Sequence, residues 1–513
     1  MKDQPLAEHV GTHGAQSARS LLERLEGAQL DPLRSQLLQR ELPGLTAAFD
    51  GEAMRRHLQE ALFDGAQANV TIEHCTPGQA IYDGDQCVLR YKLQAVNGVS
   101  GETISPLVIG RLFRDLDACK AYARGKLAPL AALMKDRQEL ESFAQPVALI
   151  EPLNMVAYVF PIDGELPALV GATDPQRMTG IFKQISPLML GEGETVEDCK
   201  VELGHYGRQH RCVLRYHVES KVPATGISNR QVVYGKVAAD GRGALAGPVI
   251  DALRERVLDA DSPYHFNIPR SFGFFPDLQL ALLEGIPGVP QVAQLLKARM
   301  QGEPPLPGSP ALEETIDACA RIGVVLHTSG ISLGEPRTLE AELATLREGF
   351  ATVERISPDL GAQFFIWLDK AEISAKRSRA MQLRFGHGDF TYTQLIFDGT
   401  SSGLVDFDTI CQAEPALDLG QFLAYARVAV LKARKKADVP SEEITKQLCE
   451  QFVSTYTKAC GDELQDIERL DDRVPVYEVI SLLRMALHSW QKLKGTRLEY
   501  VIAVLEERVP CLP

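Results

Sequence analysis

Four ionisable side chains flank a short spacer in this sequence. The stretch HGDFTYTQLIFDGTSSGLVDFD places His387 and Asp389 before a spacer rich in turn residues, and Asp406 and Asp408 after it. LIF and LVDF flank DGTSSG, which predicts a β-hairpin that brings the two ends of the stretch together. Converging carboxylates repel each other and raise each other's pKa unless they share a cation, so the pattern favours a bound Mg²⁺. The alternative is that these aspartates are turn and capping residues that face water.

The elements that must position this hairpin change in type along the chain. Residues from about 16 to 64 predict helices, because AQSARSLLERL and RSQLLQREL space their leucines at three and four residues. CVLRYKL and SPLVIGRLF then predict strands, DLDACKAYARGKLAPLAALMK predicts a helix, and VALI with MVAYVF predicts a strand pair. After the Pro-rich connection GEPPLPGSP, ALEETIDACARIGVVLH, EITKQLCEQFVSTYTKAC and YEVISLLRMALHSWQKL predict a mostly helical half that contains the hairpin.

The β-rich part carries an internal repeat. CVLRY at Cys87–Tyr91 recurs 125 residues later at Cys212–Tyr216. At the same offset, Arg111 of VIGRLFRD corresponds to Lys236 of VYGKVAAD. Two matches in one unchanged register favour a duplicated unit of strands, helix and strands over two unrelated strands of similar pattern.

Several motifs together resemble a known group of enzymes. HGD begins at His387 and is followed by Gln394 five residues after its Asp, and DFD begins at Asp406. These two motifs resemble the catalytic and metal-binding loops of the aminoglycoside phosphotransferase and choline kinase superfamily, the protein-kinase-like small-molecule kinases. LHTSGI and EPALDLGQFLAY resemble two further family segments, and LLEGIPG resembles the linker that holds adenine. The resemblance covers roughly residues 201–505.

The resemblance implies a role for each matching residue. Asp389 is expected to be the catalytic base that accepts the proton of the acceptor hydroxyl, and Asp406 to bind the Mg²⁺ that bridges the phosphates of ATP. Lys236, on QVVYGKV, is expected to pair with the phosphates. Its acidic partner on the following helix is expected to be Glu255 rather than Asp251.

The linker and the amide residue complete the expected site. Leu283 and Glu284 within LLEGIPG are expected to contact the nucleotide. Gln394 stands where the family pattern has Asn, and its amide carbonyl is expected to be a second Mg²⁺ ligand, as in maltokinase-like sugar kinases. The alternative is that Gln394 caps the start of the hairpin. GRGALAG, from Gly241, is interpreted as a flexible link between the lysine strand and its helix.

We therefore predict an α+β fold that is bilobal and protein-kinase-like, with a duplicated N-lobe-like β-rich unit and a mostly helical C-lobe. The predicted parts are an N-terminal helical segment (1–65) and a first, non-catalytic N-lobe-like repeat (66–190). They are followed by a second, nucleotide-binding N-lobe-like repeat (191–302) and a helical C-lobe with the catalytic and metal loops (303–513). No catalytic loop follows the first repeat before the second begins. The role of the first repeat stays open: it could be a cap, a dimer surface, an allosteric module or a structural duplicate.

The predicted function is ATP-dependent phosphorylation of a hydroxyl on a small polar molecule, with ATP and Mg²⁺ as cofactors and a sugar or an aminoglycoside among the acceptors considered. One alternative is a kinase-like nucleotide-binding protein without transfer activity, and another is a scaffold. A glycosidase could also use two carboxylates, but no barrel pattern surrounds them. The sequence contains no GxxxxGK[ST] phosphate loop.

Composition limits the partners. A formal net charge of -14 argues against a nucleic-acid or anionic-membrane surface. The ten cysteines are scattered without a CxxC pair, and no apolar run approaches the length of a membrane span. The sequence therefore predicts a reduced, cytoplasmic protein with no nucleic-acid or membrane partner.

Overall fold

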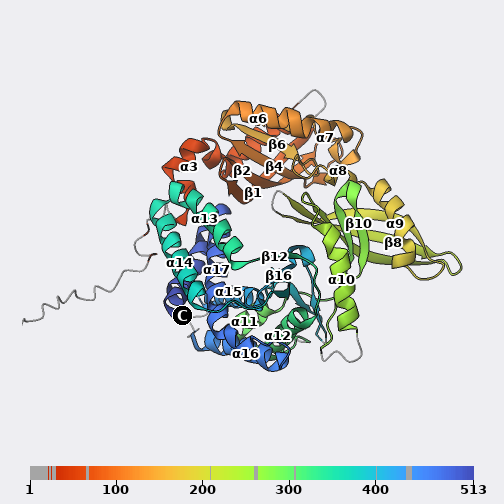
Figure 1. Ribbon diagram of the computed structural model, residues 1–513. Coiled ribbons are helices and arrows are strands. Elements are labelled where there is room, and N and C mark those ends of the chain that lie inside the picture. Colours follow the sequence, from red (N-terminus) through yellow and green to blue (C-terminus); the bar gives the residue numbers. More distant parts are fainter. Residues whose placement is uncertain are drawn as a thin grey trace, which may run out of the picture.

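The structure, a computed structural model, describes Leu21, Leu25 and residues 30–64, 69–207, 210–258, 264–304, 308–399, 401–434 and 442–513. Apart from the two leucines, the predicted helix over AQSARSLLERL lies outside the described residues. The chain forms two β-sheet units and a mostly helical C-terminal half (Figure 1).

The first unit is a six-stranded antiparallel sheet in the order β1-β2-β4-β6-β5, with β3 beside β2. Its strands are β1 (Val70–Asp83), β2 (Gln86–Asn97), β3 (Thr103–Ile104), β4 (Leu107–Phe113), β5 (Val147–Ile150) and β6 (Met155–Val159). Its helices are α3 (Gln36–Glu41), α4 (Leu45–Ala48), α5 (Gly51–Leu58), α6 (Leu116–Tyr122) and α7 (Ala128–Leu133). The Asp115 side chain caps α6 by accepting the N–H of Ala118 at 2.7 Å, so the helix begins where the sequence predicts.

The second unit has the same sheet order, β7-β8-β9-β11-β10. Its strands are β7 (Thr195–Tyr206), β8 (Arg211–Val222), β9 (Ile227–Ala238), β10 (Ser271–Phe275) and β11 (Leu280–Glu284). Its helices are α8 (Leu169–Ala172) and α9 (Pro175–Met189), which precede the sheet, and α10 (Gly243–Val257), which follows β9. The interpretation of GRGALAG as a flexible link is wrong, because α10 begins at Gly243, inside that stretch.

The strand registers confirm the duplication. Arg111 of β4 lies opposite Val88 of β2, and Lys236 of β9 lies opposite Val213 of β8. Each pair is related to the other by the 125-residue offset seen in the sequence. The two positively charged residues therefore occupy the same place in two equivalent sheets.

A glycine beside each of these residues is required by packing. A Cβ on Gly110 would lie 2.8 Å from the ring of Tyr91, and a Cβ on Gly235 would lie 2.4 Å from the ring of Tyr216. Both distances are shorter than a carbon–carbon contact allows, so a side chain at either position would displace a buried tyrosine. The same close contact between a glycine and a tyrosine ring therefore occurs at equivalent positions of the two units.

The C-terminal half is mostly helical and confirms the predicted hairpin. Its helices are α11 (Val292–Gln301), α12 (Leu312–Thr328), α13 (Leu339–Ile356), α14 (Pro358–Arg377), α15 (Pro415–Arg434), α16 (Glu442–Cys460), α17 (Leu470–Gln491) and α18 (Gly495–Arg508). Its short strands are β12 (Glu335–Pro336), β13 (Arg384–Gly386), β14 (Leu395–Phe397), β15 (Ser402–Leu404) and β16 (Cys411–Ala413). β14 and β15 pair antiparallel as the predicted hairpin. The α+β, bilobal, kinase-like arrangement with a duplicated N-lobe-like unit is therefore confirmed.

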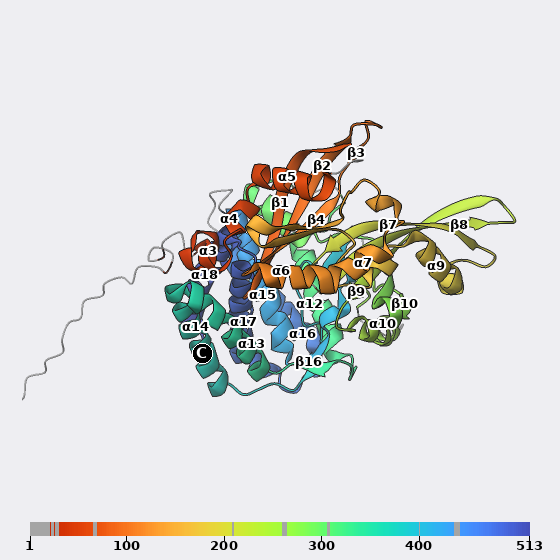
Figure 2. The ribbon, with the colours of Figure 1, turned by 90° about the horizontal axis from the view of Figure 1, so that it is seen from above.

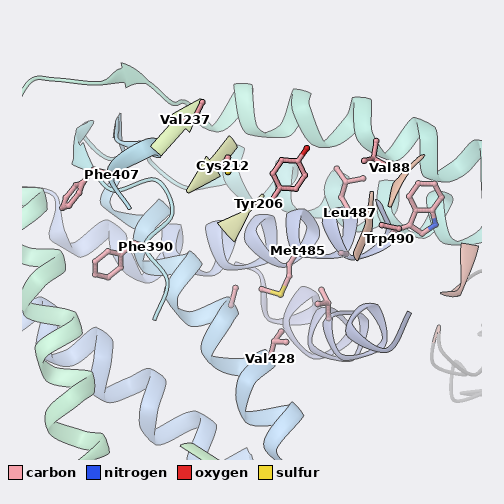
Figure 3. Close-up of a cluster of buried hydrophobic side chains, with 14 of the residues drawn as sticks. Val88, Tyr206, Cys212, Val237, Phe390, Phe407, Val428, Met485, Leu487 and Trp490 are labelled. Carbon is pink, nitrogen blue, oxygen red and sulfur yellow. The ribbon is translucent and has the colours of Figure 1, made fainter. Parts of the chain in front are cut away.

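The first unit contacts both other parts of the chain (Figures 1 and 2). Towards the C-terminal half, Arg355 of α13 donates to the hydroxyl of Tyr82 at 3.1 Å, and the Tyr82 ring packs edge-on against Trp490 of α17. Towards the second unit, the hydroxyl of Tyr206 on β7 donates to the buried carboxyl of Asp163. The buried apolar side chains between these parts include Val88, Cys212, Leu487 and Trp490 (Figure 3).

The structure also describes the cysteines and the apolar character of the helices. All ten cysteines lie in the described residues, and none forms a disulfide. Over the part of the chain that the structure describes, every helix is too short or too polar to span a bilayer.

Candidate active site

The loop that carries Asp389 is held by a buried carboxylate behind it. Asp418 of α15 accepts the backbone N–H of His387 at 2.7 Å and that of Gly388 at 2.9 Å, and the Nε2 of His327 lies 3.2 Å from it. Gly388 has a φ of +73°, and a Cβ there would lie 2.1 Å from the carbonyl oxygen of Thr409. Only glycine fits this close approach, so the turn after β13 is fixed both by its conformation and by Asp418.

The His387 side chain supports the same loop. Its ring is buried, and its Nε2 donates to the carbonyl oxygen of Val405 at 3.0 Å. Val405 directly precedes Asp406, so this bond ties the two loops of the HGD and DFD motifs together. His387 is thus placed to organise the loops.

Asp389 and Gln394 are in direct contact. The Nε2 of Gln394 donates to an oxygen of Asp389 at 3.1 Å. Burial raises the pKa of Asp389, and the negative charge of Asp406 adds to this effect, whereas His387 and the hydrogen bond from Gln394 oppose it. The two aspartates therefore lie close enough to interact electrostatically, as the hairpin prediction required.

Asp406 lies in a network of charges that joins the second sheet to the C-terminal half. Its backbone is left-handed, with a φ of 69°. The Nζ of Lys236 lies 2.5 Å from Asp406 and 3.0 Å from Asp408, and Arg211 of β8 donates to Asp408 at 2.9 Å. Burial alone would raise the pKa of Asp406, but the charges of Lys236 and Arg211 outweigh it and lower that pKa. Asp406 is therefore held ionised between two cations.

A cavity of about 340 Å³ opens above this network. Lys236, Asp406, Leu283 and Glu284, four of the residues predicted for nucleotide and metal binding, line it. The rest of its wall is formed by His205, Arg211, Val213, Tyr234, Pro269, Ile286, Gly288, Pro290, Thr393, Ile396 and Val405. The wall combines apolar side chains with the charged groups of Lys236, Arg211 and Asp406, a combination that suits a base joined to phosphates.

Two predicted glutamates differ in their relation to this cavity: Glu284 lines it, whereas Glu255 is not among its lining residues. The Glu284 carboxylate accepts from the backbone and the side chain of Arg270 at 3.1 and 3.0 Å, so its side chain already has a partner. Glu255 is exposed on α10, and within the described residues no ion pair joins it to Lys236. The structure therefore gives Lys236 two acidic partners from the DFD motif, Asp406 and Asp408, in place of the predicted helix glutamate.

Three contributing residues were not assigned a role from the sequence. Asp408 belongs to the quoted DFD motif, and Asp418 to the quoted segment EPALDLG, but neither pattern reveals which side chains they contact. Arg211 directly precedes the repeated CVLRY, and the first unit has Gln86 at the equivalent position. Its approach to Asp408 depends on how β8 faces the C-terminal half, which no local pattern encodes.

The metal-binding capacity of the site depends on oxygen donors. Among the described residues, no three His, Cys, Asp or Glu side chains form a group that could hold a metal ion. Mg²⁺ at nucleotide sites is commonly held by one or two carboxylates plus phosphate oxygens, and Asp406 supplies such a carboxylate at the wall of the cavity. The role of the Gln394 carbonyl as a second ligand stays a prediction.

A known family model matches the part of the chain that contains the site. Residues 257–443 match the model of the phosphotransferase enzyme family named APH. This segment contains the catalytic loop and the DFD motif, so the resemblance predicted from these motifs is confirmed. The chain is accordingly a small-molecule kinase by class. A search of curated proteins found no match.

Several solved structures show a limited similarity to this chain. An ethanolamine kinase of Plasmodium vivax is 14% identical with a TM-score of 0.40, covering 66% of this chain and 87% of its own. A choline kinase of Cryptosporidium parvum is 14% identical with a TM-score of 0.43, covering 65% of this chain and 94% of its own. A glucosamine kinase is 14% identical with a TM-score of 0.42, covering 86% of this chain and 92% of its own.

Proposed function

We propose that this chain transfers the terminal phosphoryl group of ATP to a hydroxyl of a small polar molecule. The observation that carries the proposal is the meeting of Asp389, Asp406 and Lys236 beside a cavity bounded by the predicted adenine linker, mostly within the segment matched by the family. Phosphoryl transfer depends chiefly on positioning and on neutralising phosphate charge, and these residues supply a base, a cation and a carboxylate for Mg²⁺.

The chain's own residues divide the work. Lys236 turns from Asp406 to the phosphates, and Arg211 adds a second positive charge at the same end of the cavity. Asp389 accepts the proton of the acceptor hydroxyl, whose oxygen forms the new bond to phosphorus while the bond from phosphorus to the bridging oxygen of ATP breaks and ADP leaves. A Mg²⁺ ion held by Asp406 and Gln394 would neutralise phosphate charge.

The two sheet units have different roles in this proposal. The second unit, whose sheet lies within the predicted range 191–302, supplies Lys236, Leu283 and Glu284 to the nucleotide, and residues 303–513 supply the catalytic and metal loops. The first unit, whose sheet lies within the predicted range 66–190, is non-catalytic. In support of this, Arg111 is only 2% exposed and its guanidinium lies over the ring of Tyr122, so the place equivalent to Lys236 is filled by the unit's own side chains.

A direct assay tests the proposal. The purified chain is incubated with ATP and Mg²⁺ and either a panel of hydroxyl compounds or a metabolite extract, and phosphorylated products are measured with and without a chelator. Metal-dependent transfer to at least one acceptor is expected. If ATP binds with Mg²⁺ but no phosphorylated product forms from any compound of a metabolite extract, the chain is a nucleotide-binding protein without transfer activity.

A further inference from the structure

A second cavity, of about 770 Å³, lies on the other side of the catalytic loop. Tyr392 and Thr393, three and four residues after Asp389, form part of its wall. Thr393 also lines the nucleotide-side cavity, so the two cavities meet at the loop that carries the proposed base. On the proposed function, this second cavity is the place for the acceptor.

The charges of this cavity are all of one sign. Lys432 of α15, together with Lys494 and Arg497 at the start of α18, lines it, and no Asp or Glu is among the described residues of its wall. Within the described residues, none of the ion pairs involves any of these three cations. A cluster of three unneutralised cations stands out in a chain whose formal net charge is -14.

The cations repel one another in the absence of an anion. Burial lowers the pKa of Lys494, and the charges of Arg497, Arg90 and Lys432 lower it further. Arg90 comes from β2, so the first unit contributes to the positive potential at this place. An anionic group bound among these side chains would relieve the repulsion and gain charge-assisted hydrogen bonds.

The remaining wall favours a flat or ring-shaped compound. Tyr392 and Tyr425 face each other edge-on, with ring centroids 6.4 Å apart, and Tyr500 of α18 also lines the cavity. Tyrosine rings offer an apolar face for packing and a hydroxyl for hydrogen bonding, which suits the alternating polar and apolar faces of a polyhydroxy ring.

We propose that the acceptor bound in this cavity is a ring compound that carries both hydroxyl groups and an anionic group, a carboxylate or a phosphate, held by Lys432, Lys494 and Arg497. The hydroxyl groups are directed to Asp389 and the anionic group to the cations of α15 and α18. Cationic acceptors such as aminoglycosides and amino alcohols are repelled by the same charges. The inference rests on the proposed function for the direction of transfer, but the binding preference can be measured without transfer.

Four compounds with one common ring test the preference: glucose, glucosamine, glucuronate and glucose 6-phosphate. Their binding to the full chain is measured by calorimetry in the presence of Mg²⁺ and a non-hydrolysable ATP analogue. The expected order is glucuronate or glucose 6-phosphate at least about tenfold tighter than glucose, with glucosamine weakest. The two anions distinguish a carboxylate site from a phosphate site.

Variants locate the effect. Arg497→Ala is expected to weaken binding of the preferred anion about tenfold, whereas Lys458→Ala, which removes an exposed lysine of α16 outside the cavity, is expected to change nothing. Binding of glucosamine as tight as that of the anions, equal binding of anions and glucose, no binding of any of the four, or an unchanged affinity in Arg497→Ala would overturn the inference. Transfer to glucosamine but not to the anions would support the proposed phosphotransfer and contradict the anionic acceptor. Binding of the anions without any transfer would support the anion site and contradict the proposed phosphotransfer.

Discussion

The ammonium of Lys236 and the carboxylate of Asp406 lie 2.5 Å apart, although 170 residues separate them in the chain. The contact joins the strand β9 of the second sheet to the loop that follows the hairpin. In the proposed reaction Lys236 binds phosphate and Asp406 binds Mg²⁺. Without nucleotide, the two side chains neutralise each other. Nucleotide binding therefore replaces this ion pair by a contact of Lys236 with a negatively charged phosphate and a contact of Asp406 with a positively charged metal ion.

The first prediction uses the duplication as its own control. Lys236→Ala is expected to weaken ATP binding about tenfold or more, because a charge-assisted contact to phosphate is lost and Asp406 is left with less positive charge beside it. Arg111→Ala removes the equivalent residue of the first unit, which is buried with Gln86 and Tyr122. We expect Arg111→Ala to lower the free energy of unfolding and to leave the ATP affinity of the folded protein unchanged.

Nucleotide titration and urea unfolding of both variants check this prediction. Equal losses of ATP affinity in folded Lys236→Ala and Arg111→Ala would show that the first unit also contacts nucleotide. An ATP affinity of Lys236→Ala equal to that of the parent would remove Lys236 from the site.

The second prediction concerns the proposed base. Asp389→Asn keeps the size of the side chain and an oxygen for the hydrogen bond from Gln394, but it no longer accepts a proton as a carboxylate does. Turnover is expected to fall by about 10² or more while ATP affinity stays near that of the parent. Steady-state kinetics and nucleotide binding measured on the same preparation test it, and unchanged turnover would be incompatible with Asp389 as the base.

The third prediction concerns Gln394. Its Nε2 is bonded to Asp389, and its carbonyl is the proposed second ligand of Mg²⁺. Gln394→Ala is expected to raise the Mg²⁺ concentration needed for half-maximal activity. Gln394→Asn is expected to restore little, because its carbonyl falls short by roughly 1.5 Å, one carbon–carbon bond.

A metal titration of both variants separates the two roles of this side chain. If Gln394 only orients Asp389, turnover falls in Gln394→Ala but the Mg²⁺ dependence stays that of the parent. That result would leave Asp406 as the metal ligand of the chain.

Much of the fold follows from local pattern. The repeated CVLRY and the Gly–Arg and Gly–Lys pairs predicted the duplication because strand register and glycine–tyrosine packing repeat with the sequence. The hairpin followed from the turn-rich DGTSSG between two apolar triplets. The glycines of GRGALAG favour a loop by local pattern, whereas burial of Gly243 and Ala246, with Gly243 against the sheet, stabilises the helix there.

The charge network could be predicted only in part. The motif identified Asp389, Asp406 and Lys236, but the partner of Lys236 was expected on the next helix, as Glu255. That glutamate is exposed, and the partners come from the other lobe. Pairing between lobes depends on how two folded units face each other, and spacing along one helix carries no information about it.

The fourth prediction is a pH dependence of stability at the contact between the two sheet units. Burial raises the pKa of Asp163, although the hydrogen bonds from Tyr206 and from the N–H of Glu165 oppose this. A raised pKa in the folded state means that the contribution of Asp163 to stability is fully present below the ordinary Asp range and is lost as pH rises through the raised value. Asp163→Asn retains an acceptor oxygen and never ionises.

Urea unfolding at several values from about pH 4 to pH 7 tests this sign. The difference in free energy of unfolding between Asp163→Asn and the parent is expected to move in favour of the variant as pH rises. Parallel curves would mean that Asp163 titrates alike in the folded and unfolded chains.

The fifth prediction concerns Asp418, which holds the catalytic loop without reaching the proposed substrates. Its two oxygens accept the backbone N–H groups of His387 and Gly388, and Asn can offer only one acceptor oxygen while its NH₂ would face the other N–H. A buried donor left without a partner costs about 1–3 kcal/mol, and the loop is expected to shift to avoid this cost. Asp418→Asn should therefore lower kcat by about tenfold or more with a smaller change in the KM for ATP, whereas Asp471→Asn, at an exposed position of α17, should change neither. If kcat is unchanged in Asp418→Asn while thermal stability falls, Asp418 supports only the fold and the position of Asp389 is set by other contacts.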